Sequence, residues 1–189
     1  MPLNTIEAIH ARYSCRDFSD RMPADDDLQT IAEAALASPS AMNRQPWQII
    51  IVKDKELIAD LETEGMKALA ALADKSAYAR LLSRGGTLFY KAPCMIVIAL
   101  NSIDSSGYEP VDCGIVTQSM ALAATSLGIN SLICGLAKFA FDGEKSEDFK
   151  QRLSFPEGYE IGIAVLLGYA AETGGTPHEL DSGKITVIE

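Results

Sequence analysis

Apolar and polar positions along the chain follow first a helical and then a strand-like period. The apolar residues between 28 and 36 recur on one helix face, and Asp25 to Asp27 precede them, at the helix end that favours negative charge. Pro39 then ends this predicted helix, because the residue before a proline is disfavoured in helical backbone. A capping-box spacing from Asn4 to Glu7 predicts another short helix at the N-terminus.

Several apolar runs rich in β-branched residues predict buried strands. They cover Trp47–Val52, Cys94–Leu100, Ser131–Leu136 and Ile161–Leu167. A polar, glycine-rich stretch then separates the last of them from a further strand-like run, 185–188. This final run has little core of its own to join, so we expect it to pair with another chain.

Longer helical patterns lie between these strands. The stretch from Asp112 to Leu127 is apolar nearly all round, which predicts a central helix or one at a dimer interface. Asp54 is expected to cap a helical stretch that continues, with interruptions, to about Leu82. Asp142 is expected to cap a helix between the third and fourth strands.

Helices and strands are mixed without strict alternation, which favours an α+β fold over a doubly wound sheet. No repeat, low-complexity segment or linker divides the chain, so residues 1–189 are expected to form a single domain. A chain of 189 residues with 48% hydrophobic content can bury a sizeable core.

The charge balance and the cysteines exclude several function classes. Sixteen Lys and Arg against 26 Asp and Glu give a net charge of -10, which argues against a nucleic-acid binder. No apolar run is long enough to span a membrane, and the N-terminus lacks the pattern of a signal peptide. Without a C-x-x-C motif and with two histidines, a metal site is not expected. We expect the four cysteines to be reduced, mostly buried thiols of a cytoplasmic protein. They are Cys15, Cys94, Cys113 and Cys134.

Standard catalytic motifs are missing. The chain has no G-x-G-x-x-G, Walker A or G-x-S-x-G sequence, and its two histidines are far apart, which weakens any catalytic triad. The sequence therefore gives little support to a hydrolase function. Cys15 lies between two arginines, a setting that lowers a thiol pKa, but we favour a structural role for it.

The segment around residues 12–18 carries unusual chemistry for an acidic chain. Arg12 and Arg16 share one face if the segment is helical, and Ser14 joins them if it is extended. Either arrangement brings guanidinium groups and a hydroxyl together, which suits a phosphate or another oxyanion. Surface ion pairs with Asp17 or Glu7 are the alternative interpretation.

A second segment, residues 38–47, combines small residues with side-chain amides and leads into a buried strand. Small residues allow a flat ligand to approach the backbone, and Asn43 and Gln45 offer amide donors and acceptors. The alternative is a plain connecting loop with Trp47 in the core.

Together the two segments resemble the nitroreductase family of flavoproteins. The family pattern is R-x-S-x-R or R-x-S-x-K, then (A/S)-P-S-(A/S)-x-N-x-Q-P-W about two dozen residues later. This chain has Arg12-x-Ser14-x-Arg16 and Ser38-Pro39-Ser40-Ala41-x-Asn43-x-Gln45-Pro46-Trp47. The likeness continues through 112–115, 121–128 and 161–168, so it covers practically the whole chain.

The resemblance implies an α+β homodimer in which helices flank a central mixed or antiparallel sheet and the C-terminal tail extends onto the partner subunit. It implies FMN at the subunit interface and ping-pong transfer of hydride from NAD(P)H through flavin N5 to a nitroaromatic, quinone or similar acceptor. The alternatives within the fold are a specialised FMN reaction, such as dehalogenation, azoline oxidation or flavin breakdown, and a low-turnover flavin-binding protein. A cofactor-free interaction domain would require both segments to be accidental.

The resemblance also implies which residues hold the cofactor. Arg12 would reach the FMN phosphate, Ser14 the phosphate or ribityl chain, and Arg16 the pyrimidine edge as an electrostatic stabiliser. No catalytic side chain or metal is expected, because the flavin carries the chemistry. The remaining expected contacts are Tyr13, then Pro39, Ser40, Ala41 and Asn43 from the other subunit, then Ile133, Cys134 and Gly135 beside the ring, and Lys184 in the tail.

The stretch between the first two strands, roughly residues 62–90, is expected to influence substrate specificity. Its side chains are available to shape an entrance, although we prefer helix packing at the dimer interface for most of them. They are Tyr78, Arg80, Arg84, Phe89 and Tyr90.

Overall fold

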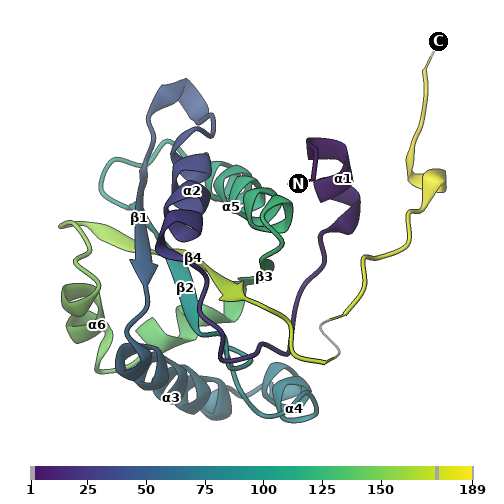
Figure 1. Cartoon of the computed structure of the whole chain (residues 1–189). Coiled ribbons are helices and arrows are strands. Elements are labelled where there is room, and N and C mark those ends of the chain that lie inside the picture. Colours follow the sequence, from purple (N-terminus) through teal and green to yellow (C-terminus); the bar gives the residue numbers. More distant parts are fainter. Residues whose placement is uncertain (1–2, 173–174, 189) are drawn as a thin grey trace.

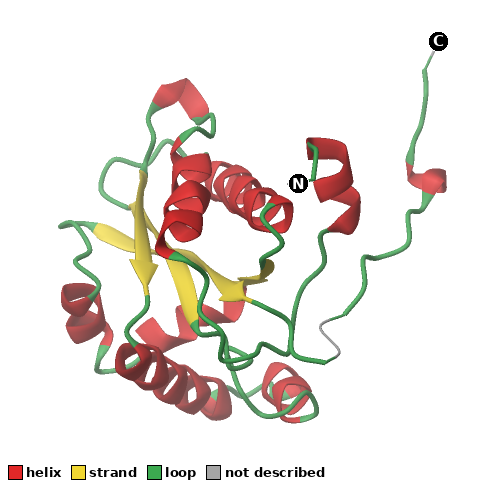
Figure 2. Ribbon diagram, viewed as in Figure 1, coloured by secondary structure: helices red, strands yellow, loops and turns green. Residues whose placement is uncertain are grey.

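The structure is a computed structural model that describes residues 3–172 and 175–188, so 1–2, 173–174 and 189 of the predicted single domain lie outside it. A four-stranded sheet lies between helices on both of its faces (Figures 1 and 2), which confirms the predicted α+β class. The elements are α1 (Thr5–Ala11), α2 (Asp25–Leu36), η1 (Ala41–Asn43, a 3-10 helix), β1 (Trp47–Val52), α3 (Lys55–Ala71), α4 (Ser76–Leu82), β2 (Cys94–Asn101), α5 (Glu109–Ser126), β3 (Asn130–Cys134), η2 (Gly135–Phe141), α6 (Ser146–Arg152), β4 (Tyr159–Gly168) and η3 (Ser182–Lys184).

The sheet has the strand order β1-β2-β4-β3, and every neighbouring pair is antiparallel. Strands β2 and β4 are therefore central, and β1 and β3 form the edges. Residues 94–99 of β2 and 164–168 of β4 are buried without interruption, because helices cover both faces. This double burial explains why the strands read as continuous apolar runs in the sequence.

The two faces of the sheet belong to two separate apolar clusters. On one face Ile98 and Val165 pack with Met120 of α5 and with residues of α2. On the other face Val97 packs with Leu61 of α3 and with residues of η2 and α6. Because neighbouring residues of a strand point to opposite faces, Val97 and Ile98 anchor different helical layers.

Helix α5 is the long apolar helix that the sequence predicts, but it begins at Glu109 rather than Asp112. Pro110 fits its first turn, where a missing N–H loses no hydrogen bond. The Glu109 carboxylate accepts N–H bonds from Ser106 and Gly107 and so fixes the preceding loop. Within residues 3–172 and 175–188, no helix is long and apolar enough to cross a membrane.

Two predicted helix caps are confirmed. The Asn4 side chain accepts the Glu7 N–H at 3.0 Å, and the Glu7 carboxylate accepts the Asn4 N–H at 2.9 Å, which completes the capping box. Asp54 accepts N–H bonds from Glu56 and Leu57 at 2.9 and 3.1 Å. The helical stretch after Asp54 divides into α3 and α4, as the expected interruptions imply.

The predicted cap at Asp142 is wrong. Helix α6 begins at Ser146 with Lys145 as its N-cap, and Asp142 instead ends η2. A turn separates the two helices, since the Gly143 carbonyl accepts the Ser146 N–H at 3.1 Å. Turn formation at this glycine therefore outweighs the local capping preference of the aspartate.

One strand prediction also needs correction. Strand β3 ends at Cys134 rather than Leu136, because the chain tightens into η2 at Gly135. The segment 185–188 forms no strand within the described single chain, where Val187 and Ile188 are 77% and 92% exposed, and its pairing with another chain stays a prediction. A strand requires a neighbouring edge, and the tail runs away from the sheet (Figure 1).

We expect Glu109 to stabilise the fold only above acidic pH. Hydrogen bonds, first from the Ser106 N–H, lower its pKa from 4.5 to about 2. A carboxyl whose pKa is lowered by folding adds stability above its unfolded pKa, and this stability is lost as the pH falls toward the folded pKa. Between about pH 5 and pH 3, the urea midpoint of the wild type should therefore fall more steeply than that of Glu109→Gln. Parallel curves for the two proteins would contradict this assignment.

Candidate functional site

The segment that follows α1 is extended, so the helical alternative for it is wrong. Helix α1 ends at Ala11, and Arg12 is its C-cap with a β-region backbone. Ser14 forms a parallel bridge with Ser131 of β3, and the Cys15 N–H donates to the Ser131 carbonyl at 3.0 Å. Cys15 points into the core, whereas Ser14 and Arg16 line a cavity. This backbone pairing fixes the serine and the arginine beside the sheet edge.

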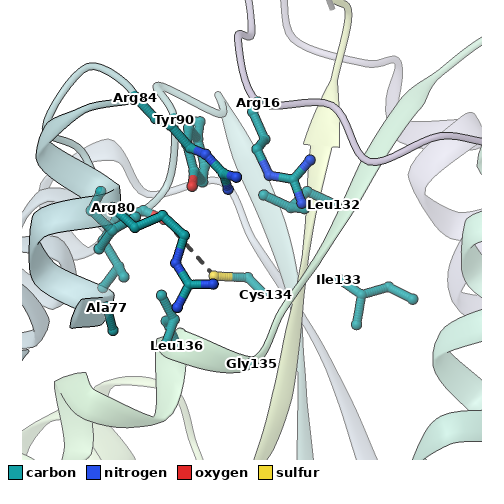
Figure 3. A pocket seen from close by; sticks show the side chains of 12 residues that line it. Arg16, Ala77, Arg80, Arg84, Tyr90, Leu132, Ile133, Cys134, Gly135 and Leu136 are labelled. Atoms are coloured by element: carbon teal, nitrogen blue, oxygen red, sulfur yellow. Dashed lines mark hydrogen bonds between the residues drawn. The ribbon is translucent and has the colours of Figure 1, made fainter. Parts of the chain in front are cut away.

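The end of β3 forms a second wall of the same region. In Figure 3 the Cys134 side chain points toward the arginines, whereas the Ile133 side chain points away from them. Ile133 therefore faces the cavity through its backbone. Gly135 follows, and apart from Gly135 and its two chain neighbours no atom of the described residues lies within 4 Å of the place where a Cβ would stand. The wall thus combines exposed backbone with a position that carries no side chain.

Helix α4 and the turn after it supply a third wall. Ala77, Arg80 and Leu81 line the cavity from α4, and Arg84 and Tyr90 line it from the chain beyond. Figure 3 shows the guanidinium groups of Arg80 and Arg84 extending into the space that the Arg16 guanidinium also enters. The sequence interpretation favoured helix packing at the dimer interface for most of these residues, which stays a prediction. Phe89, which is 1% exposed, lies in the core of its own chain and lines neither cavity.

Two adjoining cavities make up this region, which we call the arginine cleft. One has a volume of about 220 Å³ and lies between α4 and the end of β3. The other has a volume of about 510 Å³ and contains Ser14, Asp17 and Lys91. The cavities share Arg16, Arg84 and Tyr90, so one ligand can extend through both. Ligand pockets in proteins commonly have volumes of about 300–1,000 Å³.

The arginine cleft is strongly cationic. Four cationic side chains line it against one carboxylate, Asp17, among the described residues. Arg16 donates to the Ser14 carbonyl at 3.3 Å. In residues 3–172 and 175–188, Arg16, Arg80 and Arg84 form no ion pair. Unpaired guanidinium groups that converge in a concave site are suited to an anionic ligand.

Burial makes the thiols near the cleft unreactive. It raises the pKa of Cys134 to about 11, and it raises the pKa of Cys15 above its ordinary value despite the neighbouring arginine. All four cysteines are buried and unpaired in disulfides, which confirms their predicted burial. The structural role expected of Cys15 therefore agrees with its surroundings, because a buried, protonated thiol is a poor nucleophile.

Other predicted site residues lie outside the arginine cleft. Arg12 is half-buried at the end of α1. The Tyr13 hydroxyl accepts a hydrogen bond from the Asn130 side chain at 3.0 Å, and burial raises the Tyr13 pKa. Lys184 lies in the extended tail, 3.8 Å from Asp181 (Figure 1). The structure therefore gathers Ser14, Arg16, Ile133, Cys134 and Gly135 in one cleft, and leaves Arg12, Tyr13 and Lys184 outside it.

The segment with Pro39, Ser40, Ala41 and Asn43 lies at the other end of the molecule, beside the start of α5 (Figure 1). Its backbone is unusual, because Met42, Asn43 and Gln45 have φ values of 53°, 53° and 49°. Residues that carry a side chain rarely adopt this left-handed backbone conformation, because it costs on the order of 1–3 kcal/mol per residue. The fold therefore holds this loop in one strained conformation.

Buried and local hydrogen bonds hold that loop in place. Asp112, which is 2% exposed, accepts the Ala41 N–H at 2.9 Å through Oδ1. The Ser40 hydroxyl accepts the Gln45 N–H at 2.9 Å. The second Asp112 oxygen is buried and has no partner in the described chain. Sequence reasoning did not assign Asp112 a role, because its contact with Ala41 crosses 71 residues.

Comparisons with known proteins identify the family and the fold. The sequence profile described as "Nitroreductase family" matches residues 9–169. A crystal structure of a nitroreductase with bound FMN from Desulfitobacterium hafniense is 52% identical, covers 100% of both chains and superposes with a TM-score of 0.94. A nitroreductase with bound FMN from Bacteroides fragilis is 28% identical, covers 99% of this chain and 100% of its own, and has a TM-score of 0.87.

A curated relative also matches most of the chain. A Methanothermobacter thermautotrophicus protein is 28% identical over 185 residues, which are 97% of this chain and 86% of the relative. It carries the provisional name NADH dehydrogenase/NAD(P)H nitroreductase. Sequence similarity therefore extends over nearly the whole chain.

We expect Asp112→Ala to loosen the strained loop. The change leaves the Ala41 N–H without its acceptor, so amide hydrogen exchange across residues 40–46 should accelerate. Asp112→Asn is the matched control, because it keeps an acceptor oxygen and removes the charge. Exchange in the asparagine variant should remain close to that of the wild type, as measured by mass spectrometry. Equal acceleration in both variants would mean that the charge, rather than the hydrogen bond, holds the loop.

Proposed function

This chain belongs to the nitroreductase family, and we propose that it is an FMN-dependent NAD(P)H oxidoreductase. A bound flavin would supply the redox chemistry, which is ping-pong transfer of hydride from NAD(P)H through N5 to a nitroaromatic, quinone or similar acceptor. The protein supplies binding, orientation and an electrostatic field. The observation that carries this proposal is the arginine cleft. It occurs in a chain that is 52% identical to a nitroreductase with bound FMN.

The residues of the arginine cleft fit a flat ligand that bears a phosphate. Arg16 and the Ser14 hydroxyl are donors that suit phosphate and carbonyl oxygens. Gly135 and the adjacent backbone leave space for a planar ring to approach the chain. Leu88, Leu132 and other apolar side chains complete the wall. No general base is required of this lining, because the cofactor carries the reaction.

We assign separate roles to the residues of the first segment. Arg12, two residues before the cleft-lining Ser14, would bind the FMN phosphate, and Ser14 would bind the phosphate or the ribityl chain. Tyr13 supports this segment through its hydrogen bond with Asn130. Arg16 would face the pyrimidine edge, where its charge would stabilise negative charge that develops during reduction. Ile133, Cys134 and Gly135 would flank the ring.

The proposed active protein is a homodimer. Pro39, Ser40, Ala41 and Asn43 of the partner subunit complete the site, and Lys184 binds the phosphate from a tail that crosses between subunits. The support is that the loop of residues 39–43 lies at the other end of its own chain from the cleft, and that the tail runs away from the sheet (Figure 1). The exposed apolar side chains of the proposed interface are Ile6 and Ile9 of α1, Val111 and Ile115 of α5, and Ile185, Val187 and Ile188 of the tail.

The first test is the visible spectrum of the purified protein before and after anaerobic addition of NADH or NADPH. We expect a flavin spectrum that bleaches and that recovers when a nitroaromatic or quinone is added. Arg12→Ala should weaken FMN binding about tenfold or more, because one charge-assisted contact is lost. Arg16→Ala should slow bleaching about tenfold and change FMN affinity less.

Arg21→Ala is the control for these variants, because Arg21 stacks on the Tyr169 ring at 3.9 Å and lines neither cavity. It should retain both FMN binding and the rate of bleaching. Equal loss of FMN in Arg12→Ala and Arg16→Ala would disprove the division of roles. A colourless protein that takes up no added FMN would disprove the proposed function.

The proposed dimer gives a second test. Each chain has a mass of 20.3 kDa, so light scattering should report about twice this value for the wild type. Replacing Val187 and Ile188 together by aspartate should weaken association about 100-fold, because two buried apolar side chains are lost from the interface. Thr186→Asp is the control, since it adds a charge at a polar position of the same tail. A dimer of unchanged affinity in the double variant would place the interface elsewhere.

A further inference from the structure

Arg80 and Arg84 form a cationic pair that is not among the residues proposed to hold FMN. They are four residues apart, and the Arg84 N–H continues the helical turn by donating to the Leu81 carbonyl at 3.0 Å. This spacing places both side chains on the same side of α4. Both are exposed in the described chain, and Figure 3 shows them extending into the arginine cleft.

Arg80 and Arg84 are among the basic side chains that form no ion pair within residues 3–172 and 175–188. Other basic side chains do form ion pairs, such as Arg152 with Asp60 at 2.7 Å and Lys150 with Glu160 at 2.7 Å. Asp74 is close enough for the Arg80 charge to lower its pKa, although hydrogen bonds from Ser76 are the larger cause. Neither arginine has an ion-pair partner in the described part of the chain. Like charges repel, so an anion that binds between them is favoured.

The surroundings of the pair restrict the shape of that anion. The part of the cleft next to the arginines is lined by Ala77, Leu81, Leu88 and Leu136. Such a wall fits an apolar, planar body, and the arginines fit a planar oxyanion attached to it, because a guanidinium binds carboxylate through two parallel hydrogen bonds. Arg80 and Arg84 themselves are not among the residues that we assign to the cofactor, and they share the apolar lining of the cleft with it.

We propose that Arg80 and Arg84 determine acceptor specificity, and that they select flat aromatic acceptors that carry a carboxylate over their neutral analogues. This inference rests on the proposed function. It deepens that function by naming a substrate class, aromatic carboxylates with a reducible group. The two arginines are specificity-determining residues and take no part in the redox step itself.

The test compares 4-nitrobenzoate with 4-nitrobenzamide, two acceptors that differ mainly in charge. The proteins are wild type, R80Q, R84Q, the double variant R80Q/R84Q, and the control K55Q. Lys55 lies at the start of α3 and lines neither cavity of the arginine cleft, so K55Q removes a charge of the same sign elsewhere. The double variant should lose about tenfold in kcat/KM for 4-nitrobenzoate. Its kcat/KM for 4-nitrobenzamide should change less than about twofold.

Direct binding provides a readout that is independent of turnover. Calorimetry should show that wild type and K55Q bind 4-nitrobenzoate more tightly than 4-nitrobenzamide, and that R80Q/R84Q binds both alike. Added salt should reduce this preference in the wild type, because the contact is electrostatic. R80K/R84K should retain part of the preference, since the charge remains and the forked geometry is lost.

Several outcomes would overturn the inference. Equal losses of kcat/KM with both acceptors would mean that the arginines stabilise α4 and do not select the acceptor. Loss of FMN from R80Q/R84Q would assign the arginines to the cofactor, and a change confined to the KM for NADH or NADPH would assign them to the donor. A protein that binds no FMN but still prefers 4-nitrobenzoate in calorimetry would disprove the proposed function and retain the anion site. The two proposals can therefore fail separately.

Discussion

The burial of β2 and β4 on both faces is the constraint on which the rest of this structure depends. Apolar strands such as Cys94–Ala99 must be covered on each side, so the chain has to supply two helical layers. Helix α5 meets that demand on one face, and α3 with η2 meets it on the other. Covering both faces leaves the edges of the sheet for polar chemistry. The arginine cleft accordingly lies where β3 ends and α4 adjoins it.

Much of this architecture could be predicted from the sequence, because its signals are local. Continuous runs of β-branched residues predicted the four strands, and the Asn4 capping box predicted the start of α1. Features that depend on distant contacts were harder to predict. Arg80 and Arg84 carry no pattern that separates a cleft wall from a packed helix, and their position depends on how the chain between β1 and β2 folds back. The predicted strand in the tail requires an edge that the described chain does not provide.

The charge distribution explains how an acidic protein is suited to anionic ligands. A net charge of -10 describes the whole surface, whereas binding depends on the charges within about one Debye length, roughly 8–10 Å at physiological salt. The lining of the arginine cleft has four cationic side chains and one carboxylate among the described residues. The acidic remainder of the surface repels polyanions, whereas the local positive charge of the cleft attracts small anions.

The strained loop around Met42 and Gln45 has a thermodynamic consequence. Fixing the backbone of one residue costs about 1–2 kcal/mol of conformational entropy. Because Asp112 and Ser40 hold this loop within a single chain, that cost is borne during folding and not during association. Anything that docks against the loop meets a rigid template. Association there should consequently carry a small entropy penalty, and its heat-capacity change should reflect the surface buried rather than coupled folding.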